Sequence, residues 1–301
     1  TAGSTGLHSR YAEETETPFR MLTGKAVQTL PRPRARFSHK GTYGHALLIN
    51  GSFGKMGAAV LAARACLRAG AGLLTVHVPR CGYPILQSTV AEAMCSIDAS
   101  ENSRSELPNL TSFTAMGVGC GIGTDSKTAQ ALKRLLQTVS VPLVLDADAL
   151  NLLARHPTWW TFVPKNTILT PHPKEFERLF GPTPDSFARN ALQCAKAREF
   201  GVYIVLKGAF TAVACPDGTC WFNTTGNPGM ATGGSGDVLT GILTGLLAQG
   251  YPTQDACLLG VFLHGLAGDL AAAQHSQPGM TAGDITECLG GAWKGILDIG
   301  Y

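Results

Sequence analysis

Short apolar segments alternate with longer helical patterns along most of this chain of 301 residues. The apolar segments are rich in Val, Leu and Ile, as expected for strands that are covered on both faces of a sheet. We predict such strands at residues 45–50, 73–78, 115–119, 142–146, 167–170 and 203–207, and a hairpin at residues 212–215 and 220–223. We predict helices at residues 56–69, 126–138, 173–180, 186–200, 237–248, 254–274 and 281–297. This alternation predicts an α/β fold with a mostly parallel central sheet and helices on both faces.

The first 36 residues differ in composition from the rest of the chain. A polar start is followed by a basic, proline-rich run at residues 30–36. Such a run is typical of a solvated, extended linker, although its arginines are also suited to grip phosphates. We find no internal repeat and no second change of composition after residue 40. We therefore assign residues 1–36 to a linker or to the tail of an upstream domain, and residues 37–301 to a single domain.

Charge and composition argue against several classes of partner. The formal net charge is +3, which is too small to indicate a nucleic-acid partner. The longest apolar stretch, residues 256–273, contains His264 and Asp269, and it predicts a core helix instead of a membrane span. None of the nine cysteines forms a Cys-x-x-Cys pair. We therefore expect reduced thiols in a cytoplasmic protein, with no membrane partner.

Polar or glycine-rich segments follow several of the predicted strands, at residues 50–57, 117–123, 146–148, 170–173 and 207–208. In an open α/β sheet, ligands bind beyond the carboxyl ends of the strands. Turn chemistry explains any one of these segments, but their common position at one edge of the sheet predicts a ligand site there. Asp146 and Asp148 either orient water or a cation at this edge, or they cap the next helix.

A glycine-rich loop at residues 226–236 leads directly into a predicted amphipathic helix. The free N–H groups at such a helix start carry about half a positive charge and form a cradle for a phosphate. Asp237, where the helix begins, is either an N-cap or the general base for an attacking hydroxyl. The P-loop pattern and the dinucleotide-binding glycine pattern are both missing from the sequence, so this cradle belongs to another class.

Several motifs carry a resemblance to a known family. The segment GGSGD at residues 233–237 resembles the signature of the ribokinase-like superfamily, whose small-molecule kinases place a catalytic Asp after such a loop. The NAD(P)H-hydrate dehydratase family has motifs, in the same order, that are similar to KGTYGHA (40–46), GAA (57–59), AGAGL (69–73), TPHPKE (170–175) and NPGMATGGSGD (227–237). The resemblance covers residues 37 to about 300 and implies a ribokinase-like fold.

This resemblance implies an enzyme that repairs the hydrates of NADH and NADPH. Phosphorylation of the ring hydroxyl by a nucleotide makes it a good leaving group, and elimination of phosphate restores the reduced cofactor. Asp237 is then the catalytic base. The implied contacts with the hydrate come from Ala58, Gly121, His172 and Asp237. The implied contacts with the nucleotide come from Lys207, Gly208, Ala209, Phe210, Thr211 and Gly236.

Some of these residues have a purely structural alternative. Ala58 is equally suited to helix packing, and Gly121 to a tight turn. His172 lies between two prolines and fits an exposed turn, while Lys207 fits a pair with a surface acid. The whole chain has alternatives as well. It also fits a vitamin-precursor kinase of the same superfamily, which would leave a stable phosphate ester, or a nucleotide sensor without catalysis.

The resemblance implies further properties of the protein. The phosphoryl donor is ADP or ATP, and we favour ADP because the sequences of residues 40–45 and 52–57 are similar to those of bacterial members. Mg²⁺ is implied, bound mainly by nucleotide oxygens. Its protein ligands stay unassigned, because the Asn-x-x-Glu of related kinases is replaced by His172-Pro173-Lys174-Glu175. We expect a homo-oligomer, as in relatives, and an epimerase domain upstream, because residues 6–21 resemble the tail of one.

Overall fold

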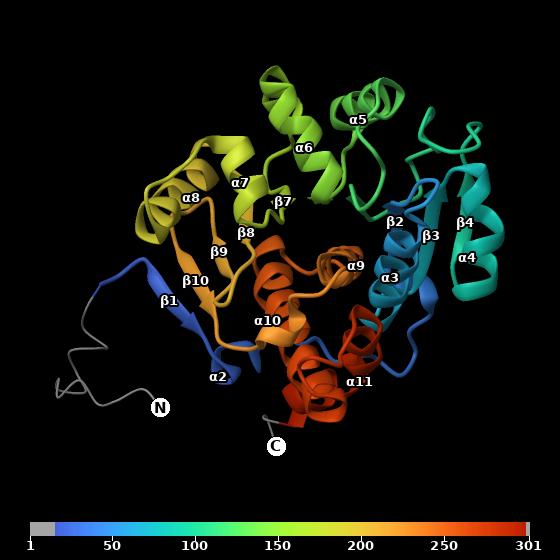
Figure 1. Ribbon diagram of the computed structural model, residues 1–301. Coiled ribbons are helices and arrows are strands. Elements are labelled where there is room, and N and C mark those ends of the chain that lie inside the picture. Colours follow the sequence, from blue (N-terminus) through green and yellow to red (C-terminus); the bar gives the residue numbers. More distant parts are fainter. Residues whose placement is uncertain (1–15, 299–301) are drawn as a thin grey trace.

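The computed structural model describes residues 16–298, and a sheet of ten strands forms its centre (Figure 1). The strand order is β1-β10-β9-β8-β7-β6-β5-β2-β3-β4. Strand β9 is antiparallel to both of its neighbours, and all other neighbouring pairs are parallel. The predicted α/β fold with a mostly parallel sheet is confirmed. The strands are β1 (Phe19–Leu22), β2 (His45–Ile49), β3 (Leu73–Val78), β4 (Met94–Ile97), β5 (Ala115–Val118), β6 (Leu143–Leu145), β7 (Ile168–Leu169), β8 (Tyr203–Leu206), β9 (Ala212–Ala214) and β10 (Cys220–Asn223).

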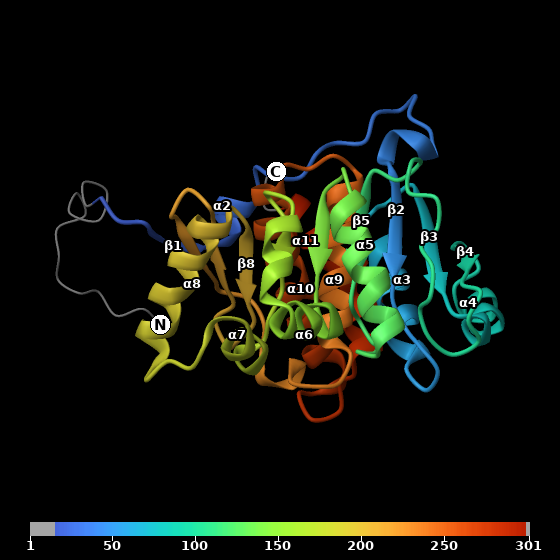
Figure 2. The same cartoon turned by 90° about the horizontal axis from the view of Figure 1, so that it is seen from above.

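Helices cover both faces of the sheet, and a separate apolar core lies on each face (Figure 2). One face is covered by α3 (Met56–Arg68), α9 (Ser235–Ala248), α10 (Thr253–His275) and α11 (Ala282–Asp298). The other is covered by α5 (Ser126–Thr138), α6 (Ala147–Arg155), α7 (Pro173–Phe180) and α8 (Ser186–Phe200). Two shorter helices are α2 (Gly24–Val27) and α4 (Tyr83–Thr89). Every predicted helix is present, whereas β1, β4, α2, α4 and α6 were not predicted.

The direction in which the chain winds changes between β2 and β5. From β2 the chain proceeds outward through β3 and β4, and from β5 it proceeds the other way toward β8. The loops that follow β2 and β5 therefore diverge, and such a switch point is where open α/β sheets bind ligands. The side chain of Asn50 joins the two loops, because its Oδ1 accepts hydrogen bonds from the N–H groups of Gly119 (3.1 Å) and Cys120 (3.0 Å).

Helix α9 is the central helix of its layer and is buried over most of its length. Two of its glycines allow the backbone of α3 to approach closely. A Cβ on Gly241 would overlap the carbonyl of Ala62, and a Cβ on Gly245 would lie 2.6 Å from the carbonyl oxygen of Cys66. Because these contacts involve backbone, which cannot rotate away, they fix where α9 begins and where it points.

The described part of the N-terminal segment packs against the domain. Strand β1 pairs with β10, and Leu22 and Val27 are fully buried in the core that contains α9. Arg32 lies over the ring of Tyr251 and donates a hydrogen bond to the carbonyl of Gly250. Residues 19–27 therefore belong to the folded sheet and its core, although they lie within the range 1–36 that we set apart from the domain.

Helix α10 is long and apolar enough to cross a membrane, judged by length and composition alone. In the structure, however, 67% of its most apolar window is buried, and it packs on α9 and α11. This position agrees with the core helix that we predicted at residues 254–274. His264 and Asp269, the two polar residues noted in the sequence, both lie on this helix.

Candidate active site

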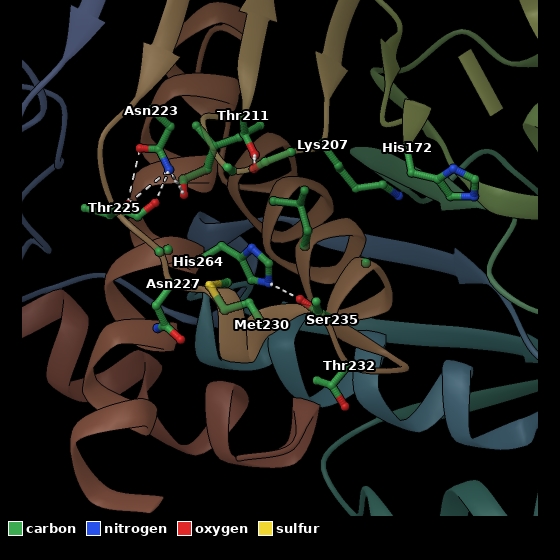
Figure 3. Close-up of a pocket in the computed structure, with 18 of the residues that line it drawn as sticks. His172, Lys207, Thr211, Asn223, Thr225, Asn227, Met230, Thr232, Ser235 and His264 are labelled. Carbon is green, nitrogen blue, oxygen red and sulfur yellow. Dashed lines mark hydrogen bonds between the residues drawn. The ribbon is translucent and has the colours of Figure 1, made fainter. Parts of the chain in front are cut away.

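A cavity of about 820 Å³ lies beyond the carboxyl ends of β6, β8 and β10 (Figure 3). Its wall includes seven of the predicted site residues, namely His172, Lys207, Gly208, Ala209, Thr211, Gly236 and Asp237. Phe210, Ala58 and Gly121, which were also predicted, do not line it. The side chain of Phe210 is 65% exposed. The cavity therefore brings together most of the predicted nucleotide contacts and the predicted base.

The start of α9 forms one wall of this cavity. Its N-cap is Gly234, which has a left-handed backbone (φ 93°) and offers no side chain to cap the helix. The turn requires glycine for this conformation, and a Cβ would also displace the end of the Leu61 side chain, whose Cδ1 would be 2.5 Å away. The first N–H groups of a helix have no partner within the helix, and they carry its positive dipole end. The anion cradle predicted from the sequence is thus open toward the cavity.

Lys207 places a second positive charge beside the start of α9. Its Nζ lies 2.9 Å from Asp146 Oδ1 and 4.0 Å from Glu175 Oε2. A Cβ on Gly236 would lie only 3.2 Å from this Nζ, so the ammonium stands directly over the start of α9. Burial by itself would lower the pKa of Lys207, but Asp146 and Glu175 outweigh it and raise the pKa above its ordinary value. Lys207 therefore stays charged next to the cradle, and its partner is a buried acid instead of a surface acid.

Asp146 follows β6, Asp148 lies in the first turn of α6, and the two carboxylates bind different neighbours. Asp146 caps α6 by accepting the N–H of Ala147, and its Oδ2 accepts a hydrogen bond from Thr240 Oγ1 at 2.8 Å. Asp148 accepts the N–H of Gly123 at 2.8 Å and lies 3.7 Å from Lys55 Nζ. Between them, Ala147 has a left-handed backbone (φ 48°), which is strained for a residue with a side chain. Capping, one of the two roles we considered for these acids, is thus observed for Asp146.

Asp237 is a largely buried carboxyl group in the first turn of α9. Burial raises its pKa to about 6, and the charges of Asp146 and Asp148 add to the effect. The Cys120 thiol and the charge of Lys207 act in the opposite direction. The N-cap alternative for Asp237 is wrong, because Gly234 occupies the N-cap position. A carboxylate with a pKa near neutrality is well suited to accept a proton from a hydroxyl.

His172 has a structural role and also faces the cavity. It is the N-cap of α7, where its Nδ1 accepts the N–H groups of Lys174 (3.1 Å) and Glu175 (3.3 Å). The Glu175 carboxylate in turn accepts a hydrogen bond from the backbone N–H of His172 at 2.9 Å, so the two residues form a capping box. Burial lowers the pKa of His172, and its side chain is still 44% exposed. A neutral ring with an accessible edge is therefore presented to the cavity from the end of β7.

Ala58 and Gly121 meet at the switch point between β2 and β5. Gly121 has a left-handed backbone (φ 65°), and a Cβ on it would lie 3.3 Å from the Cβ of Ala58 and 3.1 Å from that of Lys55. The thiol of the adjacent Cys120 lies 3.9 Å from Asp146 Oδ2. The structure thus places Ala58 and Gly121 together, and neither residue lines the cavity. Their contact with a hydrate stays a prediction.

Several cavity residues were not predicted as contacts. Asn223 and Thr225 come from the end of β10, and His264 comes from the middle of α10 (Figure 3). Asn223 Nδ2 donates to the carbonyl of Val261, which joins β10 to α10 at the inner wall. His264 Nε2 lies 3.4 Å from Ser235 Oγ. These residues stand in no recognisable motif, because the sheet brings them together from distant parts of the chain.

Comparison with known proteins gives a consistent result. Residues 46–290 match the family described as NAD(P)H-hydrate dehydratase. Over 281 residues, the chain is 44% identical to a bifunctional NAD(P)H-hydrate repair enzyme Nnr from Moorella thermoacetica, covering 90% of this chain and 53% of that protein. The chain thus spans about half the length of this curated relative.

Two solved structures are similar over nearly their whole length. One is the ADP/ATP-dependent NAD(P)H-hydrate dehydratase from Bacillus subtilis, co-crystallised with ATP/Mg²⁺, with a TM-score of 0.82 and 33% identity over 92% of this chain and 98% of that one. The other is a ribokinase-like superfamily protein from Enterococcus faecalis, with a TM-score of 0.82 and 29% identity over 94% of this chain and 98% of that one. The predicted ribokinase-like fold is confirmed.

Proposed function

The chain belongs to the NAD(P)H-hydrate dehydratase family, and we propose that it dehydrates the hydrates of NADH and NADPH at the expense of a nucleotide. ADP is the donor that we favour, with ATP as the alternative. One observation carries the proposal. The Asp237 carboxylate, whose pKa is raised to about 6, lies beside a phosphate cradle made by the start of α9 and the Lys207 ammonium.

The chemistry follows from this arrangement. Asp237 removes the proton of the ring hydroxyl, and the oxygen attacks the terminal phosphorus of the nucleotide. The bond from this phosphorus to the bridging oxygen breaks, which releases AMP from ADP or ADP from ATP. The N–H groups at the start of α9 and the Lys207 ammonium stabilise the charge on the phosphoryl group as it moves. Phosphate is a better leaving group than hydroxide. The lone pair of the ring nitrogen then expels it, which leaves an iminium ion. Loss of a proton from the adjacent ring carbon forms the ring double bond again, and the reduced cofactor is released.

Mg²⁺ would contribute charge neutralisation on the nucleotide phosphates. In the part of the chain that the structure describes, no three His, Cys, Asp or Glu side chains are grouped to hold a metal ion. Asp146 and Glu175 line the cavity, but both are already near Lys207. These donors fit an ion that would be held mainly by phosphate oxygens and water, and Asp146 and Glu175 would be the residues to hold it.

The decisive experiment offers the purified hydrate with ADP and with ATP in separate reactions. Recovery of the reduced-nicotinamide absorbance, together with release of phosphate, is the expected result. Asp237→Asn is expected to lower kcat by about 10²–10⁴-fold, because it removes the base. A stable phosphate ester in place of the recovered cofactor would favour the vitamin-precursor kinase. The absence of any recovery with both nucleotides would overturn the proposal.

Thermal unfolding of Asp237→Asn shows whether a loss of activity reflects misfolding. The pKa of Asp237 is raised in the folded protein from 3.8 to about 6, so the ionised carboxylate destabilises the fold as the pH rises through this window. Asn carries no such charge. We therefore expect the variant to melt at or above the wild-type temperature at neutral pH, with this advantage disappearing below about pH 4.

Three predictions concern the protein beyond its site. The homo-oligomer and the cytoplasmic location stay proposals based on the sequence alone. The upstream epimerase domain rests on residues 6–21, most of which lie outside the described residues, and it also stays a proposal.

A further inference from the structure

We propose that α10 positions the phosphate-binding loop, with Asp269 holding its start and His264 holding its end. The loop is the segment of residues 226–236 that leads into α9. This proposal rests on the proposed function, because it assigns a role to two residues through the cradle that the loop forms. It also explains why two polar side chains interrupt the apolar middle of this helix.

Asp269 accepts two hydrogen bonds from the start of the loop. Its Oδ2 accepts the N–H of Gly226 at 2.9 Å, and its Oδ1 accepts Nδ2 of Asn227 at 3.0 Å. The Oδ1 of Asn227 in turn accepts the N–H of Gly229 at 3.0 Å. The carboxylate therefore orients the Asn227 amide, and the amide fixes the turn that follows. Hydrogen bonds to a charged acceptor are stronger than neutral ones, so this anchor is a firm one.

Two glycines on α10 allow the start of the loop to pack closely against the helix. A Cβ on Gly265 would overlap Thr225, and a Cβ on Gly268 would overlap the Met230 side chain. Thr225 Oγ1 also donates to the carbonyl of Phe262 on α10 at 3.0 Å. The start of the loop thus lies directly on the helix, with no space to shift toward it.

His264 meets the other end of the loop, as the dashed line in Figure 3 shows. Its Nε2 lies 3.4 Å from Ser235 Oγ, and Ser235 is the residue before Gly236 and Asp237. Burial lowers the pKa of His264 to about 4, so the ring is neutral at physiological pH and adds no charge to the cradle.

Two residues in the second half of the loop have little support of their own. Ala231 and Gly233 are exposed, and a Cβ on Gly233 would meet nothing within 4 Å. Asn227, Met230, Thr232 and Ser235 nevertheless form the cavity wall. Gly229 also lies close to Gln277 and Met280, which follow α10. Helix α10 contacts both ends of the loop, at Asp269 and at His264, and therefore contributes to the position of this wall. A shift of about 1 Å in catalytic geometry can cost roughly 10²-fold in rate.

An exchange of side chains between positions 227 and 269 tests the Asp269 anchor. In Asp269→Asn, the new amide group faces the Nδ2 of Asn227, so two donors meet. In the double variant Asn227→Asp/Asp269→Asn, the new carboxylate accepts from the new amide and from the N–H of Gly229, while the amide oxygen accepts the N–H of Gly226. All three hydrogen bonds are then restored with the charge moved by only about one hydrogen-bond length.

We expect Asp269→Asn to lower kcat/KM for the nucleotide by roughly 10–100-fold and to weaken ADP binding in calorimetry, with the double variant recovering most of both losses. Asp255→Asn is the matched control. It changes an acid in the first turn of α10, about 21 Å from position 269, and is expected to behave as wild type. All assays are run well below the melting temperature of the weakest variant.

Each outcome decides the proposal. If Asp269→Asn lowers the melting temperature but leaves kcat/KM and ADP affinity at wild-type values, Asp269 is only structural and the inference is wrong. If activity falls and the double variant does not recover it, pairing with Asn227 is not the cause, and the inference is also wrong. Failure of the proposed function is distinguishable, because wild type would then bind ADP without restoring the reduced cofactor, or would not bind ADP.

Discussion

The pKa of Asp237 is held down by Cys120, a buried thiol that comes from the loop after β5. The same thiol lies 3.9 Å from Asp146 Oδ2, so it stands between two acids of the site. Burial raises the pKa of Cys120 well above its ordinary value, and the neighbouring acids add to this effect. Cys120 therefore stays protonated and acts as a donor. It lowers the basicity of Asp237 without lining the cavity.

The pH dependence of the reaction tests this role. A base with a pKa of about 6 must lose its proton to act, so kcat/KM is expected to fall as the pH drops below about 6. Cys120→Ala removes a donor that lowers this pKa, and the acidic limb of the profile should move to higher pH. Cys257→Ala, at a buried position on α10, is the control and should leave the limb in place. An unchanged limb in Cys120→Ala would show that the thiol does not tune the base.

The sequence predicted the residues that stand in motifs or at strand ends. Lys207 and Asp237 were predicted because each follows or begins a recognisable element, and both line the cavity. Asn223 and His264 were not predicted, because their roles depend on contacts between β10, α9 and α10 that no local pattern encodes. The raised pKa of Asp237 also depends on burial, which is a property of the folded chain.

At the scale of elements, the close contact between α3 and α9 determines where the cradle lies. Gly241→Ala would place a methyl group against the carbonyl of Ala62 and push the two helices apart. We expect a loss of about 1–3 kcal/mol in the free energy of unfolding and a lower kcat, because the start of α9 moves with the helix. Urea unfolding and steady-state kinetics measure the two effects.

Gly290→Ala is the matched control for this substitution. Gly290 is also a helical glycine, but it is exposed on α11, and a Cβ there would meet nothing within 4 Å. Ala has the higher helix propensity, so this variant should gain about 0.5–1 kcal/mol. Equal effects of the two substitutions would show that helix propensity, and not the contact with α3, governs the response.

The elements that the sequence analysis missed are short or lie outside the alternating pattern. Strand β4 has only four residues and its first and last are exposed, so it shows no apolar run. Strand β1 lies before the proline-rich segment and exposes three of its four residues. Helix α6 begins directly after β6, with Asp146 as the N-cap, so no loop separates the two elements. Long buried strands and amphipathic helices, by contrast, were predicted because burial on one or both faces leaves a clear pattern.

At the scale of the whole molecule, the described N-terminal segment completes one end of the sheet. It adds β1 as the outermost strand beside β10. Its later residues contact the segments that follow the C-terminal ends of α3 and α9. Arg34 lies 3.9 Å from the ring centre of Tyr43 and donates to the carbonyl of Gly70, which follows α3. Arg32 reaches Gly250 and Tyr251, which follow α9. Arg32 and Arg34 of the basic run thus bind to the protein itself, while residues 32–36 stay exposed to solvent.

A chain that starts at residue 37, the domain boundary drawn from composition, is therefore expected to be less stable than the full chain. It lacks the buried Leu22 and Val27, and burying each such side chain contributes about 1.5–3 kcal/mol. We expect the free energy of unfolding to fall by about 3 kcal/mol or more, measured by urea denaturation. Leu22→Ala in the full chain should show part of this loss, whereas Met21→Ser, at a side chain that is 55% exposed, should change stability by less than about 0.5 kcal/mol. If the truncated chain were as stable as the full one, β1 and the segment after it would add nothing to the stability of the fold. That result would support a domain boundary at residue 37.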